Sequence, residues 1–424
     1  MIRRLARTLD PRLPTQVWLL QIGGVMNSFG NGIVLPFLVI YLHDIRGFGL
    51  GISGLVVATS AAAQLTAGIG AGPLVDRLGA KRVLGAGLVM QSIGIGLFPL
   101  VRSPWEAFLL IAIEGAGSAG FWPSQSTLIA RLTPPQRRHA AYAQQRVTMN
   151  LGIGLGGLTG GLIASVSSPT SFTVLFLVDA ATFLAYVVVL FFIHDDGPLE
   201  HHADAPSSYR AVLRDRVFGR LWILNFLFVA AGYSLFNLVP PFARDQADVS
   251  EHQIGALFFI NTIVIVLAQL PISRAIEGRR RMRALALMPA LWVICWLLLD
   301  FAGWRFDGTT AFVLMAVALA IFGVGECFHG PAHQALVAEI GPAHLRGRYF
   351  AVHSLSWGLA GTVGPALGGF VLAAAPFALW PLAAVVCAIA AVGALRTEPR
   401  IPGELARIPH ADPEPPVLAL AGTG

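Results

Sequence analysis

The sequence GPLVDRLGAKR, at residues 72–82, forms a charged break between two long apolar stretches. It contains two glycines, one acid and three bases, namely Gly72, Gly79, Asp76, Arg77, Lys81 and Arg82. The glycines permit a sharp turn and a close approach of neighbouring helices. The aspartate can accept backbone N–H bonds at a helix N-terminus, and the bases favour a position at anionic headgroups. The stretch therefore predicts a short cytoplasmic loop between two membrane-spanning helices.

The composition places the whole chain in a membrane. Of its 424 residues, 55% are hydrophobic and 12% are charged, and its mean hydropathy is +0.68. Soluble domains carry about 25% charged residues, and an apolar stretch of about 20 residues crosses a bilayer as a helix. Such stretches recur along the sequence, which predicts an all-α integral membrane protein. The cysteines, Cys295, Cys327 and Cys387, show no disulfide or zinc-site spacing.

Twelve spans are predicted, in two groups of six separated by a polar linker. The first group covers residues 17–42, 51–72, 83–101, 105–131, 141–166 and 171–193. The second group covers residues 218–242, 251–273, 284–302, 310–339, 348–374 and 377–395. The predicted parts are a first half (1–193), a cytoplasmic linker (194–217), a second half (218–396) and a disordered cytoplasmic tail (397–424).

Basic residues are distributed unevenly between the two sides of the predicted membrane. With both termini in the cytoplasm, 24 of the 29 Lys and Arg residues fall on the cytoplasmic side. This bias follows the positive-inside rule. Only one lysine accompanies 28 arginines, as expected of a GC-rich bacterial genome. We therefore expect a multi-pass protein of a bacterial plasma (inner) membrane, whose basic residues face lipid headgroups and not nucleic acid.

An internal repeat relates the two halves. The stretch that begins FWPSQSTLIARLTPPQRR at residue 121 aligns without gaps with HGPAHQALVAEIGPAHLR at residue 329. The matched pairs are Pro123 with Pro331, Pro134 with Pro342, Arg138 with Arg346, and Gly160-Gly161 with Gly368-Gly369. Two homologous six-helix halves predict a binding site between them, near the bilayer midplane.

The loop at residues 72–82 resembles the signature between helices two and three of the major facilitator superfamily, and the twelve-span layout extends this resemblance over nearly the whole chain. The resemblance implies a secondary transporter that works by alternating access, without a cofactor or a resident metal, and we expect a monomer. It also implies that Asp76 braces the two halves in the outward-open state by meeting the start of span eleven. The second-half loop at residues 271–283 keeps Pro271 and Gly278 but has lost the acid.

Within the superfamily the chain is most similar to the twelve-span drug:proton antiporters. Their fifth span usually carries a proline in a glycine-rich motif, and this sequence has Gly157 there. The proline version stands in span eleven, at Pro365.

Ionisable residues inside spans indicate function because a charge at the bilayer centre is costly. Glu326 lies near the midplane, and His329 and His333 follow it at i+3 and i+7, on one face of a continuous helix. His353 on span eleven lies at a similar depth to His333. The predicted proton-coupling residues are Glu326, His329, His333, His353, Glu114 and Asp179. Glu326 is the leading proton carrier of this set.

Two other interpretations of this polar face remain. It can be a hydrogen-bonded seam between helices. A metal site from Cys327, His329 and His333 is disfavoured, because Gly330-Pro331 interrupts the helix between the histidines. We therefore predict no metal site.

Polar and aromatic residues near mid-depth are the candidate substrate contacts. They are Asn27, Asn31, Gln125, Arg146, Asn225, Tyr233, Asn237, Asn261 and Trp357. Each of them can instead hold two helices together. So few charges among so many apolar groups favour a lipophilic substrate over a sugar.

These observations predict a transporter that exports a small lipophilic compound or drug in exchange for protons. Symport of a nutrient is the alternative within the transporters. A membrane sensor or an integral-membrane enzyme is the rival of another class. The sequence contains no HExxH motif and no Ser/His/Asp arrangement, so we expect no enzyme.

Overall fold

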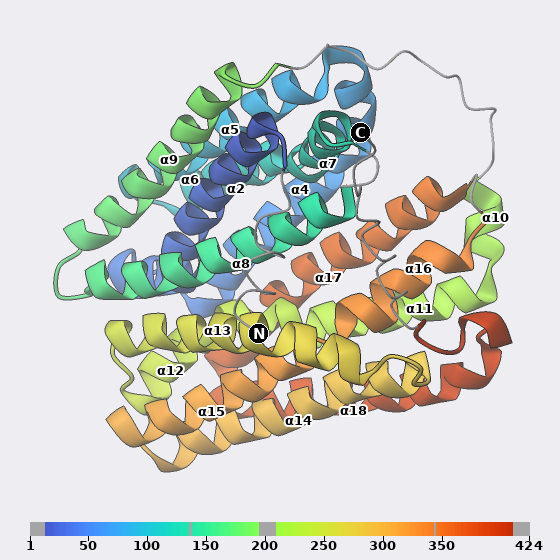
Figure 1. The fold of residues 1–424 in the computed structure, drawn as a ribbon. Helices are drawn as coiled ribbons and strands as arrows, with labels where there is room; N and C mark the ends of the chain where they lie inside the picture. The colour runs from blue at the N-terminus through green and yellow to red at the C-terminus, as the bar shows by residue number, and fades with distance from the viewer. Residues whose placement is uncertain (1–12, 135–137, 195–208, 343–344, 410–424) are drawn as a thin grey trace, which may run out of the picture.

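The computed structural model describes residues 13–134, 138–194, 209–342 and 345–409. Within these ranges the chain is helical, and its helices form two bundles that lie against each other (Figure 1). The first bundle contains α2 (Thr15–Val34), α3 (Leu38–Ile40), α4 (Leu50–Leu78), α5 (Ala80–Gly96), α6 (Pro104–Ser118), α7 (Phe121–Leu132), α8 (Arg138–Ile163) and α9 (Thr170–Phe191). The second contains α11 (Arg216–Phe228), α12 (Val239–Ala247), α13 (Glu251–Ala275), α14 (Arg281–Arg305), α15 (Gly308–Glu326), α16 (Ala335–Ile340), α17 (Arg346–Ala374) and α18 (Pro376–Thr397). The short helix α10 (Tyr209–Arg214) precedes the second bundle.

Ten helices in the described part of the chain are long and apolar enough to cross a membrane. They coincide with ten of the predicted spans. The predicted fourth span is broken into α6 and α7, which have 15 and 12 residues. The predicted fifth span is α8, a helix of 26 residues whose first half is polar. The fourth and fifth spans therefore lie where they were predicted, but neither is a continuous apolar helix long enough to cross a membrane.

Three other spans change helix type partway along. The chain adopts a π-helical turn at Tyr41–Ile45, at Val229–Tyr233 and at Gly330–Gln334. The last of these contains Pro331, which has no N–H to continue an α-helical ladder. The kink predicted at Gly330-Pro331 is thus a π-helical segment between α15 and α16.

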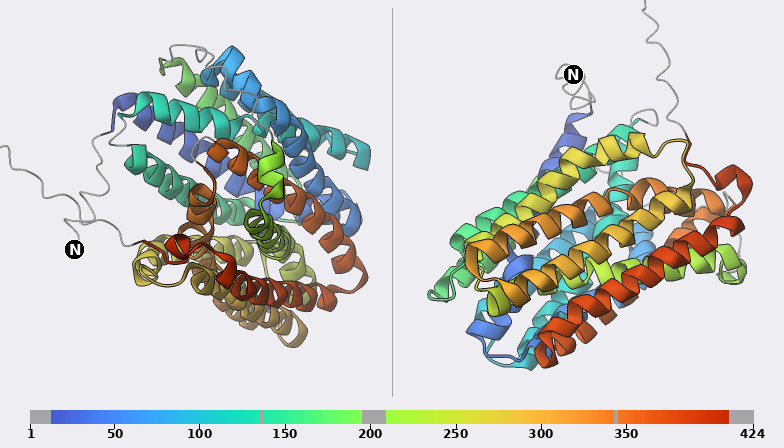
Figure 2. Two further views of the ribbon diagram at one scale, coloured as in Figure 1. Left: turned by 90° about the vertical axis from the view of Figure 1, so that its right-hand side faces the viewer. Right: turned by 90° about the horizontal axis from the view of Figure 1, so that it is seen from below.

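The two bundles meet along two helix pairs, α4 with α17 and α8 with α13, which run beside each other in Figures 1 and 2. Glycines set the close approach. A Cβ on Gly54 would lie 2.3 Å from the carbonyl oxygen of Pro365, and a Cβ on Gly161 would lie 2.7 Å from the Cα of Gly255. Small residues at such crossings let helix backbones pack closely in a membrane.

The chain beyond α18 differs from the predicted disordered tail. Residues 398–409 form two 3₁₀ turns, Glu398–Arg400 and Gly403–Leu405, and bury Ile401 and Ile408 against the second bundle. Apolar side chains at these two positions explain why the segment packs despite its polar composition. The rest of the predicted tail, 410–424, and most of the predicted linker, 195–208, lie outside the described residues.

Candidate functional site

A cavity of about 1160 Å³ lies between the two bundles. It is lined from the first bundle by the segment from α2 to α3 and by α4, α5, α6, α7 and α9. From the second half it is lined by α10, the π-turn Val229–Tyr233, the residues after it, and α17. Along α4 it extends from Val57 to Pro73, so it reaches the end of the molecule that carries the loop at residues 72–82. We call this the basic end, after the arginines and the lysine of its loops.

The opposite end is closed by contacts between the bundles. Arg244 on α12 forms an ion pair of 2.6 Å with Asp44 of the first bundle and one of 3.7 Å with Glu251 of its own bundle. Glu251 Oε1 also accepts a hydrogen bond of 3.3 Å from the backbone N–H of Val166. The cavity is therefore shut at this end and extends toward the basic end.

Two carboxyl groups line the first-bundle side of the cavity. Glu114 on α6 accepts a hydrogen bond of 2.6 Å from Ser60 Oγ on α4. Asp179 on α9 is 1% exposed and accepts a 3.5 Å bond from Thr182 Oγ1. Among the described residues that line the cavity there is no Arg, Lys or His. The two acids thus have hydrogen-bond partners but no cationic partner on this described cavity wall.

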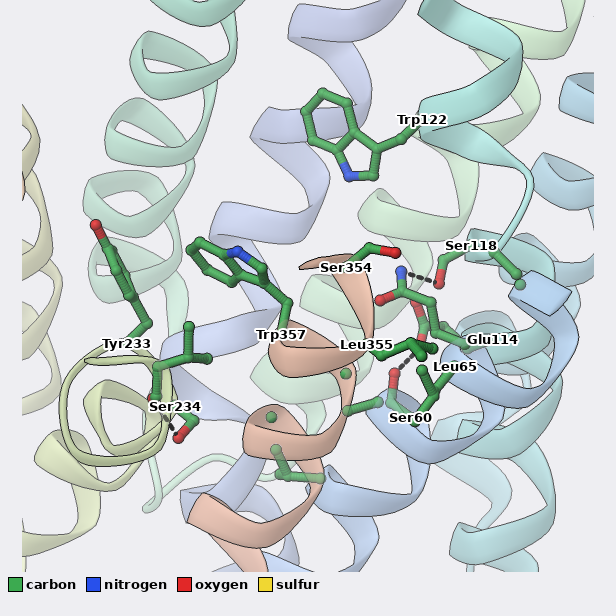
Figure 3. A pocket seen from close by; sticks show the side chains of 18 of the residues that line it. Ser60, Leu65, Glu114, Ser118, Trp122, Tyr233, Ser234, Ser354, Leu355 and Trp357 are labelled. Atoms are coloured by element: carbon green, nitrogen blue, oxygen red, sulfur yellow. Dashed lines mark hydrogen bonds between the residues drawn. The ribbon is translucent and has the colours of Figure 1, made fainter. Parts of the chain in front are cut away.

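The second-bundle side is aromatic. Tyr233 and Trp357 both line the cavity, with ring centroids 5.1 Å apart. Figure 3 shows these two rings on one side, with Glu114, Ser60 and Ser118 on the other. Trp122 on α7 adds a third ring and is 48% exposed. An aromatic face opposite a carboxyl group is suited to a cation with an apolar body.

Six predicted residues line this cavity: Glu114, Asp179, Asn31, Tyr233, Asn237 and Trp357. Sequence reasoning missed Ser60, Gln64, Ser118 and Trp122. Ser60 and Gln64 are four residues apart, so they share a face of a span that is otherwise mostly apolar, and this pattern is a usable signal. Gln64 Nε2 donates a hydrogen bond of 2.8 Å to Ser118 Oγ across α4 and α6.

Three predicted substrate contacts serve instead in helix–helix hydrogen bonds. Gln125 donates to Tyr186 Oη at 2.8 Å and accepts from Gln145. Asn261 donates to the carbonyl oxygen of Leu319 at 3.2 Å. Asn225 is wholly buried, as described below. None of the three lines the cavity, because each side chain points into a helix interface within its own bundle.

The two remaining candidates also lie off the cavity wall. Asn27 is 4% exposed on α2. Arg146 on α8 is exposed and donates a hydrogen bond of 3.3 Å to Gln334 Oε1 in the second bundle. Arg146 therefore connects the bundles and does not pair with Glu114.

The three histidines form a buried cluster in the second bundle, as their predicted depths indicated. The ring centroids of His329 and His333 are 5.1 Å apart, and those of His333 and His353 are 5.2 Å apart. His329 Nε2 donates to Asn225 Oδ1 at 2.9 Å, and Asn225 Nδ2 donates to Ser356 Oγ at 2.8 Å. The cluster joins α11, the π-turn and α17 and lies outside the cavity lining.

Glu326 does not continue this cluster. Its carboxylate accepts a hydrogen bond of 3.4 Å from Asn261 Nδ2 on α13. The α-helix ends at Glu326, and a turn and a π-helical segment follow. The prediction of one shared face assumed a continuous α-helix, and the break turns Glu326 toward α13 while the histidines face α11 and α17. No group of three His, Cys, Asp or Glu side chains in the described ranges is placed to hold a metal ion.

The stretch at residues 72–82, predicted to be a loop, is helical except at Gly79: residues 72–78 complete α4 and residues 80–82 begin α5. Gly79 adopts a φ of +89°, and Gly278 in the second-half loop adopts +70°. Both are left-handed conformations that favour glycine. Lys81 Nζ donates a hydrogen bond of 2.7 Å to the carbonyl oxygen of Ile193, and Arg77 and Arg82 are the other basic residues of the loop.

Gly72 and Asp76 lie outside the part of the structure whose side-chain surroundings are described. The expected contact between Asp76 and span eleven therefore stays a prediction.

Comparison with known proteins places the chain among transporters. It is 23% identical over 371 residues to an uncharacterized MFS-type transporter, YhjO, of Bacillus subtilis (strain 168), covering 86% of this chain and 88% of the relative. It is 24% identical to a Na(+), Li(+), K(+)/H(+) antiporter of Planococcus maritimus, covering 78% and 84%. It is also 24% identical to the multidrug resistance protein MdtH of Cronobacter sakazakii, covering 84% and 86%.

Solved structures share the fold. A POT family transporter in complex with 5-aminolevulinic acid has a TM-score of 0.77 at 14% identity, over 91% of this chain and 96% of that one. A mutant of the nucleoside transporter NupG has a TM-score of 0.76 at 15% identity, over 90% and 99%. The family model of the Major Facilitator Superfamily matches residues 20–250 and 221–420. The chain is therefore a multi-pass bacterial membrane transporter that belongs to the major facilitator superfamily.

Proposed function

We propose that this transporter exports small lipophilic organic cations in exchange for protons, and that Glu114 and Asp179 carry the exchange. The observation that carries the proposal is the cavity wall itself. Two carboxyl groups, with no cationic partner among the described lining residues, line the same cavity as the neighbouring rings of Tyr233 and Trp357. The name of one relative, a Na(+), Li(+), K(+)/H(+) antiporter, supports the exchange of a cation for protons, and the name of another, a multidrug resistance protein, supports a drug-like substrate.

The exchange follows from the cost of burying charge. An ionised carboxylate in a low-dielectric cavity is unfavourable unless a proton or a counter-ion neutralises it. A bound organic cation and a bound proton can each neutralise the same carboxyl group, so their binding is mutually exclusive. Cation binding then strengthens as the pH rises, and proton loading releases the cation. Protons driven inward by their gradient would thus move the cation outward.

The direction of transport is tied to the orientation of the molecule. We place the basic end and both termini in the cytoplasm, because 24 of the 29 Lys and Arg residues fall on that side of the predicted spans. The cavity then takes up its substrate from the cytoplasm or from the inner leaflet of the plasma membrane. We propose that a monomer is sufficient, since the cavity lies within one chain.

The experiment uses the full-length protein in liposomes with an imposed pH gradient and tetraphenylphosphonium as the probe. We expect transport of this cation in the direction opposite to proton flow, and a loss of at least about 100-fold in the Glu114→Gln, Asp179→Asn double variant. A neutral lipophilic compound of similar size is the matched control and should not exchange with protons. Cation movement in the same direction as protons would establish symport and overturn the proposal. So would undiminished exchange by the double variant.

A further inference from the structure

The chain beyond α18 lies across the basic end of the second bundle, beside the loop that joins α13 and α14 (Figures 1 and 2). We call residues 398–408 the C-terminal strap. Ile401 and Ile408 are each 6% exposed, and both belong to the main apolar core. Burial of two isoleucine side chains ties the strap to the bundle.

Backbone pairing holds the strap to the loop. Gly278 N donates to the Ile408 carbonyl oxygen at 2.9 Å, and Ile408 N donates to the Arg279 carbonyl oxygen at 3.0 Å. Arg281 N donates to the Ala406 carbonyl oxygen at 2.9 Å. The positive φ of Gly278 turns the loop so that its backbone faces the strap. The strap thus occupies a surface formed by the loop between α13 and α14.

The beginning of the strap adds ion pairs. Glu398 contacts Arg280 at 2.6 Å and Arg283 at 3.0 Å, and its own side chain is 10% exposed. When the two loops are aligned at Gly79 and Gly278, Lys81 of the first bundle corresponds to Arg280. Lys81 donates to the Ile193 carbonyl oxygen just beyond α9. Both loops are therefore held by the chain that follows the last helix of their bundle. In the second bundle the strap supplies a carboxylate, that of Glu398, as the partner of the loop.

Arg281 links the strap to α16. Its side chain is only 1% exposed, its Nε donates to the Arg407 carbonyl oxygen at 3.1 Å, and its guanidinium pairs with Glu339 at 2.6 Å. Glu339 belongs to α16, the short helix that follows the π-turn Gly330–Gln334. Without the strap the guanidinium would lose the Arg407 carbonyl oxygen and become more exposed to water, and an exposed ion pair is weak. Removal of the strap would therefore weaken the pairing of Arg281 with Glu339 on α16.

We propose that the C-terminal strap is an intramolecular latch that fixes α16 in the position seen here, in which the cavity reaches the basic end. The helix α16 follows a non-α-helical turn, and such element-terminal segments absorb hinge motion. The strap holds α16 through Arg281 and Glu339. Release of the strap favours the conformation in which the basic end is closed.

The experiment compares two truncations of the full-length protein. Ending the chain after Thr397 removes the strap, whereas ending it after Pro409 keeps the strap and is the matched control. The readout is the rate at which a hydrophilic maleimide alkylates Ser354→Cys, because Ser354 is exposed on α17 and lines the cavity. The three native cysteines are buried, and the protein without the Ser354 change is the blank.

We expect the truncation after Thr397 to slow alkylation by at least about fivefold, because the closed conformation becomes the major one. The truncation after Pro409 should react at the rate of the full-length chain. Equal rates for both truncations would overturn the proposal. A lower melting temperature with an unchanged rate would overturn it as well, since the strap would then only stabilise the fold.

Point variants keep the test decisive if the shorter chain aggregates. Glu398→Gln removes the charge that pairs with Arg280 and Arg283, and Glu339→Gln removes the partner of Arg281. Both should slow alkylation in the same direction as the truncation. Arg400→Gln is the control, because Arg400 lies in the strap and hydrogen-bonds to the carbonyl oxygen of Arg396 in the preceding helix. Unchanged rates in both glutamate variants would refute the latch. The assay needs neither substrate nor proton gradient, so its result is independent of the proposed transport reaction.

Discussion

The two bundles place their ionisable groups in different surroundings, although a sequence repeat relates them. In the first bundle, Glu114 and Asp179 line the cavity. In the second bundle, His329, His333 and Glu326 are not among the residues that line the cavity, and Glu326 accepts a hydrogen bond from Asn261. The same scaffold thus places its acids on a cavity wall on one side and uses its polar groups to join helices on the other. Position within a membrane span does not by itself identify a coupling group.

The largest expected difference is between acids on and off the cavity wall. Glu114→Gln alone should lower gradient-driven transport of tetraphenylphosphonium by about 100-fold, because the cavity loses a carboxyl group that we propose exchanges a proton. Glu326→Gln should stay within about threefold of the wild type, since the amide can still contact Asn261. Initial rates in liposomes measure both. A greater loss in Glu326→Gln than in Glu114→Gln would return Glu326 to its position as leading proton carrier.

A second test displaces an acid without changing its charge. A Cβ on Gly30 would lie 2.2 Å from both Asp179 Oδ1 and Thr182 Oγ1, so Gly30→Ala must move the aspartate. We expect transport to fall by about tenfold, because moving a functional group by only about 1 Å can lower a rate substantially. Gly24→Ala on the same helix is the control, as its Cβ would be 3.3 Å from the Gln125 amide nitrogen. Equal activity of the two variants would show that the position of Asp179 is not important.

A third test examines the histidine cluster. Asn225→Ala removes the partner of His329 and of Ser356 in a fully buried site. The free energy of unfolding should fall by about 1–3 kcal/mol, the cost of leaving buried polar groups unpaired. The dissociation constant for tetraphenylphosphonium should not change. Thermal unfolding and binding in detergent measure the two effects, and weaker binding at unchanged stability would assign the cluster to the substrate site.

The smallest expected effect concerns the aromatic face. Trp357→Leu keeps an apolar side chain but removes the ring beside Tyr233, and it should weaken binding of tetraphenylphosphonium by about threefold, as expected for one cation–π contact. Binding of a neutral compound of similar size should change less. If both ligands lose affinity equally, the ring contributes only apolar contact area.

The sequence predicted the helices and the repeat because both depend on local apolar stretches and local matches. It also predicted that His329, His333 and His353 lie together. It misplaced Glu326, because the change from α- to π-helix after this residue alters which residues share a face. The cavity depends on which helices of the two bundles face each other, and this packing is not local. The strap was missed because a few apolar residues, Ile401, Leu405 and Ile408, are all that distinguish it from a solvated tail.

The pair of acids in the cavity has a consequence for the electrical balance of transport. If Glu114 and Asp179 each carry one proton inward for every substrate carried outward, a monovalent cation leaves one net charge moved per cycle. Such a cycle is electrogenic, and the membrane potential adds about 2.3 kcal/mol per charge at 100 mV to the pH gradient. A divalent cation in the same cavity would be exchanged without net charge movement. The valence of the substrate would then decide whether the membrane potential drives export together with the pH gradient or whether the pH gradient acts alone.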